Sequence, residues 1–415
     1  MNFVKQVYCR LFQTALKLAY PLLPYRTPEI LRSVTEVPAL LKKQNIRRVL
    51  IVTDATLHRS GLLDPLKSAL SAGDVDYMIF DETVSNPTVH NVETAQSLYL
   101  AKGCQGLIGF GGGSAIDCAK AVGARIARPR KSIPQMKGIL RVLRKTPYTV
   151  AIPTTSGTGS ETTVATVITD HTTGHKFPIS DFPLIPDAAV LDPEITRSLP
   201  PRITAETGMD ALTHAIEAYI GRSTFKTTRA DALQAAKLIA ENLEAAYHNG
   251  SNMTARSNML QAAFLAGNAF SRSYVGYCHA VAHSLGGQYN IAHGLANAVL
   301  LPNILEAYGS SIHKQAKDIA VAMHLADSTT AEHIAAQRLI SHIRQMNANM
   351  GIPTTLPGIC QADITRLAVY AEKEANPLYP VPVLMTAKEL EPFYYNVMED
   401  SHDQRANCAN RKKAA

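Results

Sequence analysis

The chain has 415 residues, of which 46% are apolar and 18% charged, and it carries a formal net charge of +7. This length exceeds what one hydrophobic core usually holds, so we expect two domains. No apolar run reaches the roughly 20 residues of a membrane-spanning helix. The sequence has no tryptophan and no aromatic residues interleaved with its basic ones, which argues against a nucleic-acid partner. Six scattered cysteines without a CxxC pair indicate a reducing compartment, so we expect a cytoplasmic protein.

The first twenty residues predict an amphipathic helix. Apolar side chains recur at helical spacing from Val4 to Leu18. Three basic residues stand between them: Lys5, Arg10 and Lys17. Lys17 interrupts the apolar centre that a signal peptide needs, so we expect residues 1–24 to stay in the mature protein as an extension. We expect this helix to pack on the body of the protein or on a second subunit, and contact with a membrane surface is the alternative.

Residues 25–201 alternate short apolar runs with helical stretches. The predicted strands are 49–54, 75–80, 106–110, a run ending near Ile152, and 188–191. The predicted helices between the first of these are 62–72 and 88–101. This alternation is typical of an α/β domain with a parallel sheet and crossover helices. In such sheets, ligands bind at the carboxyl ends of the strands.

The strand 106–110 leads into a glycine-rich loop that fits a pyrophosphate. The run Gly111-Gly112-Gly113 lets a ligand approach the backbone closely, and we expect Ser114 and Asp117 to form a capping box at the start of the next helix. The amide groups and positive dipole at a helix start favour an anion. The GxGxxG spacing of the ordinary Rossmann fingerprint is absent.

Other polar residues at strand ends are candidates for the same dinucleotide. They are Asn86, Pro87, Thr154, Thr155, Thr158, Ser160 and Lys176. Asp54, at the end of the first predicted strand, can accept hydrogen bonds from both hydroxyls of an adenine ribose. It would repel a 2′-phosphate, so we expect NAD(H) rather than NADP(H).

Beyond residue 202 the periodicity is helical throughout, after a proline-rich hinge at 199–202. The predicted helices are 205–220, 228–247, 254–272, 278–288, 296–307, 311–325, 330–347, 363–375 and 386–398. This half of the chain is therefore predicted to be an all-α domain.

Five residues of this half carry the chemistry of a metal site. Asp210 and His214 are four residues apart, as are His279 and His283, so each pair lies on one face of a helix. His293 stands just before another predicted helix. One aspartate with three histidines suits Fe²⁺ or Zn²⁺ with a position open for a substrate. The spacing does not decide which of the three later histidines bind the metal.

In these motifs and their order, the sequence resembles the iron-containing (group III) alcohol dehydrogenase family over about residues 30–395. The resemblance implies an α/β NAD-binding domain at 25–201 and a helical metal-binding domain at 202–415, with metal and nicotinamide meeting between them. It also implies that homodimers are common. By resemblance the metal ligands are Asp210, His214, His279 and His293.

The resemblance also implies which residue contacts which part of the cofactor. It implies that Gly111 to Ser114 bind the pyrophosphate, that Asp54 faces the adenine ribose and that Lys176 lies near a ribose. It places His283 beside the nicotinamide and substrate, where we expect it to move the proton of the reaction. Two segments depart from the pattern of the family, so the size and charge of the substrate stay open. One contains Arg272 and Tyr274, and the other is the proline-rich stretch 374–382.

The expected function is Fe²⁺- and NAD(H)-dependent interconversion of primary alcohols and aldehydes by hydride transfer. One alternative is a zinc-type glycerol or polyol dehydrogenase of the same superfamily. Another is a lyase similar to dehydroquinate synthase, which is disfavoured because few basic residues surround the metal motifs. A non-catalytic binding protein would not need a phosphate loop and a metal set together.

Overall fold

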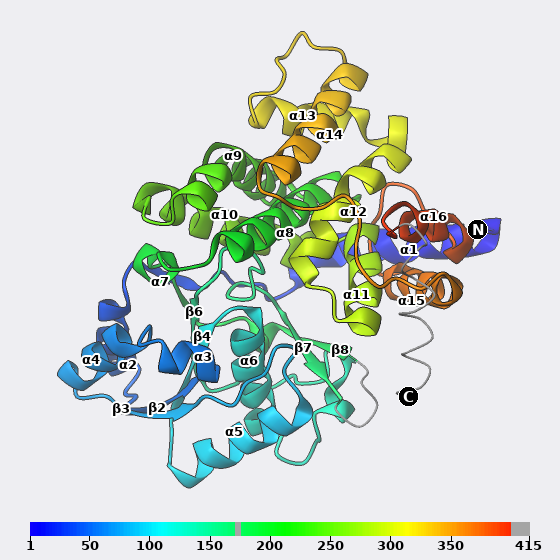
Figure 1. Cartoon of the computed structure of the whole chain (residues 1–415). Helices are drawn as coiled ribbons and strands as arrows, with labels where there is room; N and C mark the ends of the chain where they lie inside the picture. The colour runs from blue at the N-terminus through cyan, green and yellow to red at the C-terminus, as the bar shows by residue number, and fades with distance from the viewer. Residues whose placement is uncertain (171–175, 400–415) are drawn as a thin grey trace. The chain divides into compact units, whose positions relative to one another are not determined.

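The computed structural model describes residues 1–170 and 176–399 (Figure 1). The chain divides into two compact units. Unit 1 consists of Met1–Leu23, Pro200–Asn249 and Arg272–Ala415, and unit 2 consists of Pro24–Leu199 and Gly250–Ser271. The chain passes between them at Pro200, inside the predicted hinge. Residues 250–271 group with unit 2, whereas the sequence analysis expected them within one helical domain from 202 to 415.

Unit 2 is built on a six-stranded sheet in the order β1-β9-β6-β4-β2-β3, with all neighbouring strands parallel. Its strands are β1 (Glu29–Leu31), β2 (Arg48–Val52), β3 (Asp76–Phe80), β4 (Gly106–Gly111), β6 (Tyr148–Pro153) and β9 (Ala188–Val190). The predicted α/β architecture is confirmed. Strand β1 was not predicted, because its three residues are too few to show a period.

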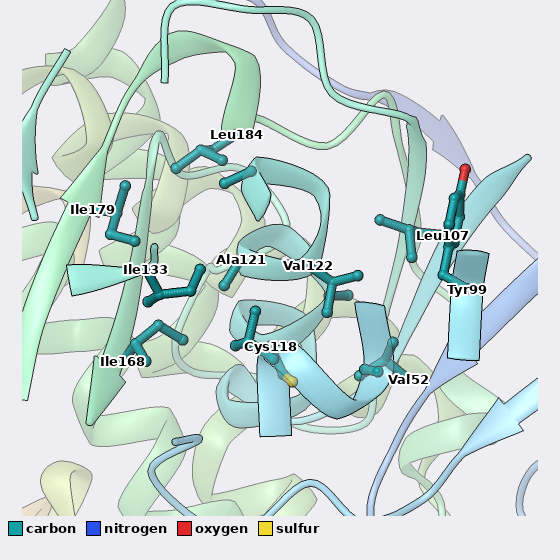
Figure 2. Packing of buried hydrophobic residues seen from close by; sticks show 14 of the residues in the cluster. Val52, Tyr99, Leu107, Cys118, Ala121, Val122, Ile133, Ile168, Ile179 and Leu184 are labelled. Carbon is teal, nitrogen blue, oxygen red and sulfur yellow. The ribbon is translucent and has the colours of Figure 1, made fainter. Parts of the chain in front are cut away.

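Helices cover this sheet, and α6 is the one most enclosed. The α-helices of unit 2 are α2 (Val37–Lys43), α3 (Ala55–Arg59), α4 (Asp64–Ala72), α5 (Val89–Ala101), α6 (Gly113–Ala127) and α7 (Pro193–Thr196). Figure 2 shows Cys118 and Val122 of α6 among Val52 and Leu107 of the sheet. This packing fixes the start of α6 at the carboxyl end of β4.

A second, three-stranded sheet was not predicted. It has the order β5-β8-β7, with strands β5 (Gly138–Ile139), β7 (Ala165–Thr169) and β8 (Lys176–Ser180). Strands β7 and β8 are antiparallel, and Lys176 pairs with Thr169. The N–H of Thr169 also donates to the carbonyl of Pro87 at 2.8 Å, which ties β7 to the loop after β3.

Unit 1 is helical, as predicted. Its α-helices are α1 (Phe3–Ala19), α8 (Pro201–Ile220), α9 (Lys226–His248), α11 (Tyr277–Tyr289), α12 (His293–Tyr308), α13 (His313–Ala322), α14 (Glu332–Asn349), α15 (Ile364–Ala375) and α16 (Ala387–Asn396). Helix α10 (Met253–Ser273) is divided between the units. The short 3-10 helices of the chain are Tyr20–Leu22, Val34–Glu36, Pro134–Met136, Phe182–Leu184, Gly309–Ile312 and Gln361–Asp363. No helix in the described part of the chain is long and apolar enough to cross a membrane.

The predicted N-terminal helix forms and lies beside α15 and α16 in unit 1 (Figure 1). Its contacting side is not the apolar one. Cys9 and Gln13 are buried, whereas Val4, Leu11 and Leu18 are exposed. The helix therefore packs on unit 1 with the side of Cys9 and Gln13, and the predicted apolar side from Val4 to Leu18 faces solvent.

The cysteines match the expectation of free thiols in part. Cys9, Cys104, Cys118 and Cys278 are buried and free. Cys360 is disulfide-bonded, so the expectation is wrong for this residue. Cys408 lies outside the described residues.

Candidate metal and dinucleotide sites

Asp210 and His214 lie one turn apart on α8 and are both buried, with 2% and 4% of their surface exposed. His214 Nδ1 lies 4.0 Å from Asp210 Oδ2. A buried carboxylate is costly unless it is partnered. Asn297 of α12 supplies one partner, because its Nδ2 donates to Asp210 Oδ1 at 2.7 Å. The predicted pair is therefore held inside unit 1 with its oxygens oriented.

His279 of α11 lies against this pair, with its ring stacked on that of His214 at a centroid separation of 4.4 Å. Its Nδ1 lies 2.6 Å from Glu217 Oε2, so its Nε2 is turned toward Asp210 Oδ1, 3.8 Å away. Among the described residues, this buried Nε2 has no hydrogen-bond partner. Burial lowers the pKa of His279 well below its usual value. A neutral imidazole with a free nitrogen is the form that binds a metal.

Glu217 also determines how α11 begins. Its carboxylate accepts the N–H groups of Gly276 and Cys278, each at 2.8 Å, which are amides that a helix start leaves unsatisfied. Burial raises the pKa of Glu217 to about 7, although these bonds oppose the rise. A Cβ at Gly276 would lie 2.6 Å from Glu217 Oε1, and one at Gly294 would lie 2.2 Å from the carbonyl of Glu206. The two glycines therefore allow the starts of α11 and α12 to lie against α8.

His293, the first residue of α12, completes a cluster of four. Its Nε2 lies 3.4 Å from Asp210 Oδ1, and its side chain is 37% exposed. One candidate ligand atom from each of Asp210, His214, His279 and His293 lies within 4.8 Å of the others. A carboxylate and three imidazoles in this arrangement fit Fe²⁺ or Zn²⁺. These are the four residues that the family resemblance implied, and solvent reaches them from the side of His293.

His283 lies beside this cluster but has a different partner. Its Nδ1 lies 2.6 Å from Glu374 Oε1, and its ring stacks on that of His293 with centroids 5.0 Å apart. Glu374 also accepts the hydroxyl of Tyr379 at 2.8 Å. The side chains of His283 and Glu374 are 39% and 36% exposed. Sequence reasoning did not find this partner, because Glu374 is 91 residues away and no spacing rule connects the two.

In unit 2, the chain turns from β4 into α6 through the glycine run. Gly112 is the N-cap of α6, and no side chain caps the helix. The predicted capping box is therefore wrong: the helix begins before Ser114, whose Oγ instead accepts the N–H of Asn86 at 3.3 Å. The physical reason is the extended backbone at Gly112, which makes this glycine the N-cap, so α6 starts at Gly113 and not after Ser114. An uncapped helix start fits a phosphate group.

The hydroxyl-rich loop after β6 lies next to the glycine run. A Cβ at Gly113 would lie 2.9 Å from Thr158 Cγ2, and one at Gly112 would lie 3.6 Å from the side chain of Thr155. The N–H of Thr154 donates to a glycine carbonyl of the run at 3.0 Å. Six of the predicted cofactor residues therefore come from two loops that touch: Gly111, Gly112, Gly113, Thr154, Thr155 and Thr158.

Asp117 and Ser160 connect these loops to each other. Ser160 Oγ donates to one carboxylate oxygen of Asp117, and the N–H of Val167 donates to the other at 2.8 Å. Lys120, which is 2% exposed, donates from Nζ to the carbonyls of Ser160 and Thr163 at 3.0 and 2.9 Å. Burial lowers the pKa of Lys120 to about 8. Lys120 was missed, because a buried lysine in a helix has no sequence signature.

Asp54 and the pair Asn86–Lys176 lie at strand ends of unit 2. Asp54 is the N-cap of α3, where its Oδ1 accepts the N–H groups of Thr56 and Leu57 at 2.9 Å each. Asn86 has a left-handed backbone with φ of 61°, and its Oδ1 accepts Lys176 Nζ at 2.7 Å. Burial lowers the pKa of Lys176. The structure therefore brings together two candidates that are far apart in the sequence.

Comparison with known proteins gives two family matches that follow one another along the chain. Residues 31–193 match the family described as iron-containing alcohol dehydrogenase, and residues 204–398 match its C-terminal family. The chain is 36% identical over 340 residues to the NAD-dependent methanol dehydrogenase of Bacillus methanolicus, covering 81% of this chain and 88% of that protein.

Two further relatives extend this result. The bifunctional aldehyde-alcohol dehydrogenase AdhE of Escherichia coli (strain K12) is 34% identical over 384 residues, covering 84% of this chain but 43% of AdhE, so the chain spans less than half of that relative. A crystal structure of a 1,3-propanediol oxidoreductase matches with a TM-score of 0.87 and 33% identity over 91% of this chain and 100% of that chain. The chain therefore belongs to the iron-containing alcohol dehydrogenase family.

Proposed function

We propose that the chain is a metal- and NAD(H)-dependent alcohol dehydrogenase that interconverts primary alcohols and aldehydes by hydride transfer. The observation that carries this proposal is the convergence of Asp210, His214, His279 and His293 within 4.8 Å. The second support is an uncapped helix start that follows a glycine run in unit 2. A cation site and a dinucleotide site in one chain suit a reaction that polarises an oxygen and moves a hydride.

The metal ligands have distinct tasks within this proposal. A divalent cation held by the four residues, with Fe²⁺ as the proposed ion and Zn²⁺ as the alternative, supplies Lewis acidity toward the substrate oxygen. Glu217 holds His279 in the tautomer that leaves Nε2 free for the cation. Asn297 holds one oxygen of Asp210 in place. Both contacts orient the cluster before substrate arrives.

The cofactor is proposed to be NAD(H), held by unit 2. The amides at the start of α6 bind the pyrophosphate, and Thr155 and Thr158 border the same loop. Asp54 uses Oδ1 to cap α3, so Oδ2 can accept the ribose hydroxyls. A carboxylate in this position repels the additional phosphate of NADP(H).

His283 is proposed to move the proton. Alcohol oxidation sends a hydride to the nicotinamide and a proton to solvent, and an imidazole can exchange protons near neutral pH. His283 is partly exposed and stacks on His293, so it can connect the cluster to water. Glu374 fixes the ring through Nδ1. A homodimer is proposed from the family resemblance. A cytoplasmic location is proposed from the buried free thiols of Cys9, Cys104, Cys118 and Cys278, although Cys360 is disulfide-bonded.

The test is an assay of hydride transfer under anaerobic conditions. Purified protein loaded with Fe²⁺, and separately with Zn²⁺, is mixed with NADH and each of a panel of short aldehydes, and the nicotinamide absorbance is followed. We expect the wild type to oxidise NADH. We expect no oxidation by an Asp210→Asn variant that is folded like the wild type. If the metal-loaded wild type oxidises no NADH with any aldehyde in the panel, the proposal is wrong.

A further inference from the structure

Helix α1 is attached to unit 1 by polar side chains. Arg10 donates two hydrogen bonds, of 2.7 and 2.9 Å, to main-chain carbonyls of the segment 377–382. Gln13 donates two more to carbonyls of the same segment, at 3.1 and 2.8 Å. Lys17 donates to the carbonyl of Arg222 at 2.9 Å. These bonds, together with the buried Cys9, hold the helix without using Val4, Leu11 or Leu18.

The opposite side of α1 is an apolar stripe that faces solvent. Its exposed side chains are Phe3 (79%), Val4 (75%), Tyr8 (57%), Leu11 (66%), Leu18 (73%) and, just beyond the helix, Leu22 (86%). Val4, Leu11 and Leu18 are seven residues apart and form one line along the helix, about 21 Å long at 1.5 Å per residue. A continuous stripe of this kind on a surface marks a contact site, whereas scattered exposed apolar residues do not.

The charges around the stripe indicate what covers it. Residues 1–28 contain four basic residues and no aspartate or glutamate. Lys5 forms an ion pair with Glu372, but among the described residues no ion pair neutralises Arg10 or Lys17. Arg222 and Lys226 are exposed at the C-terminal end of the helix. A second copy of the chain would bring like charges to this basic surface, whereas an anionic bilayer would bring opposite ones.

The helix also lies outside the part of the chain that the family requires. The family match begins at residue 31, after α1 has ended. None of the candidate metal or dinucleotide residues lies on α1 or contacts its apolar side. The stripe therefore serves something other than hydride transfer.

We propose that α1 lies flat on an anionic lipid bilayer, with the stripe from Phe3 to Leu18 inserted at the boundary between headgroups and acyl chains. Interfacial helices of this type reach about 5–10 Å into the bilayer. The amphipathic ring of Tyr8 favours that boundary, and Phe3 is of the type found on the apolar face of such helices. The polar side of α1 stays bonded to unit 1, so the whole enzyme is carried to the membrane surface.

The test is cosedimentation of the full-length, metal-loaded protein with lipid vesicles. The wild type is mixed with vesicles of phosphatidylcholine alone and with vesicles that also contain phosphatidylglycerol. A Leu11→Glu/Leu18→Glu variant removes the stripe. A Leu100→Glu/Leu143→Glu variant is the matched control, since these leucines are 58% and 62% exposed in unit 2 and the charge change is equal.

We expect the wild type and the control to sediment with the anionic vesicles and to be released by salt. We expect the stripe variant to bind at least about tenfold more weakly, because each buried leucine contributes strongly to partitioning. Its dehydrogenase activity in solution should be unchanged, which verifies its fold. Failure of the wild type to bind, or equal loss in the control, would overturn the proposal. Dissociation of an oligomer by the stripe variant, without vesicle binding by the wild type, would assign the stripe to a second copy.

Discussion

Glu217 and His279 share a hydrogen bond of 2.6 Å that links two helices of unit 1 at the candidate metal cluster. Glu217 lies on α8, the helix that also carries Asp210 and His214, whereas His279 lies on α11. The carboxylate also accepts two amides at the start of α11. One buried side chain therefore orients a metal ligand and fixes the helix that carries it.

Glu217→Gln should weaken metal binding roughly 10- to 100-fold, as is usual when the partner of a ligating histidine is lost. The amide nitrogen of glutamine cannot accept a hydrogen bond. It therefore leaves either the N–H of Cys278, which Oε1 accepts, or both the N–H of Gly276 and His279 Nδ1, which share Oε2, without an acceptor. Metal affinity measured by competition with a chelator checks this. Glu241→Gln, at a glutamate that is 41% exposed, is the control. An unchanged affinity in Glu217→Gln would mean that the carboxylate only fills space.

His283→Ala and His293→Ala should separate proton transfer from metal binding. We expect His293→Ala to lose the metal, because its Nε2 lies 3.4 Å from Asp210 Oδ1 in the cluster. We expect His283→Ala to keep the metal and to lose kcat by about 10²- to 10⁴-fold, the usual range for a proton-transfer group. Metal content and steady-state kinetics of both variants check this. Loss of metal from His283→Ala would show that the four ligands are assigned wrongly.

Glu374→Gln should lower kcat by roughly tenfold and leave metal content unchanged. The substitution keeps the size of the side chain but removes the charge that orients His283 through Nδ1 at 2.6 Å. The pH profile of kcat should shift as well, because the proton-exchanging ring loses an anionic neighbour. Glu332→Gln, at an exposed position on α14, is the control. If kcat and its pH profile match the wild type, Glu374 has no part in proton movement.

Asp54→Asn should narrow the preference for NADH over NADPH by roughly fivefold, because one charge near a phosphate is worth about 1 kcal/mol in a solvated site. Asparagine keeps an oxygen to cap α3, so the bonds to Thr56 and Leu57 can persist. Dissociation constants of both cofactors, measured by quenching or enhancement of nicotinamide fluorescence, check this. A preference that does not move would place the adenine ribose away from Asp54.

The burial of Lys120 should make the free energy of unfolding depend on pH in the alkaline range. Burial lowers its pKa from 10.5 to about 8 in the folded chain. Between these values the unfolded chain holds a proton that the folded chain has lost, so the free energy of unfolding rises with pH across this window. The full rise from this group is about 3 kcal/mol.

Lys120→Met should abolish that rise and lower stability at neutral pH by about 2–3 kcal/mol, because the carbonyls of Ser160 and Thr163 lose their donor. Denaturant titrations from pH 8 to 10.5 check both effects. The matched control is Lys102→Met at an exposed lysine. A pH dependence that is the same in Lys120→Met and in the wild type would contradict the assignment.

Local patterns predicted most of the fold and the first half of the metal cluster. Asp210 and His214 could be paired from their spacing, because both lie on one helix. The choice between His279 and His283 could not be made that way, since both lie on the same face of α11. Tertiary structure separates the two: His279 lies with Asp210, His214 and His293 in the candidate metal cluster, whereas His283 lies beside it and contacts Glu374.

Two other expectations failed for related reasons. The capping box at Ser114 was wrong, because the backbone conformation of Gly112, and not the side-chain pattern, determines where α6 begins. The periodicity of α1 predicted a helix but could not predict which side contacts the protein. Hydrophobic patterning assumes an apolar partner, and much of the contact here is made with a row of carbonyl oxygens at 377–382.

That row of acceptors has an evolutionary consequence. In the segments that receive Arg10, Gln13 and Lys17, the bonded carbonyls belong to the main chain, so these contacts do not depend on which side chains those segments carry. The ion pair of Lys5 with Glu372 is a side-chain contact beside them. Neutral drift in the sequence of 377–382 can proceed without detaching the helix, provided the backbone keeps its path. A helix held in this way could be gained by an existing enzyme through a few substitutions on the helix alone.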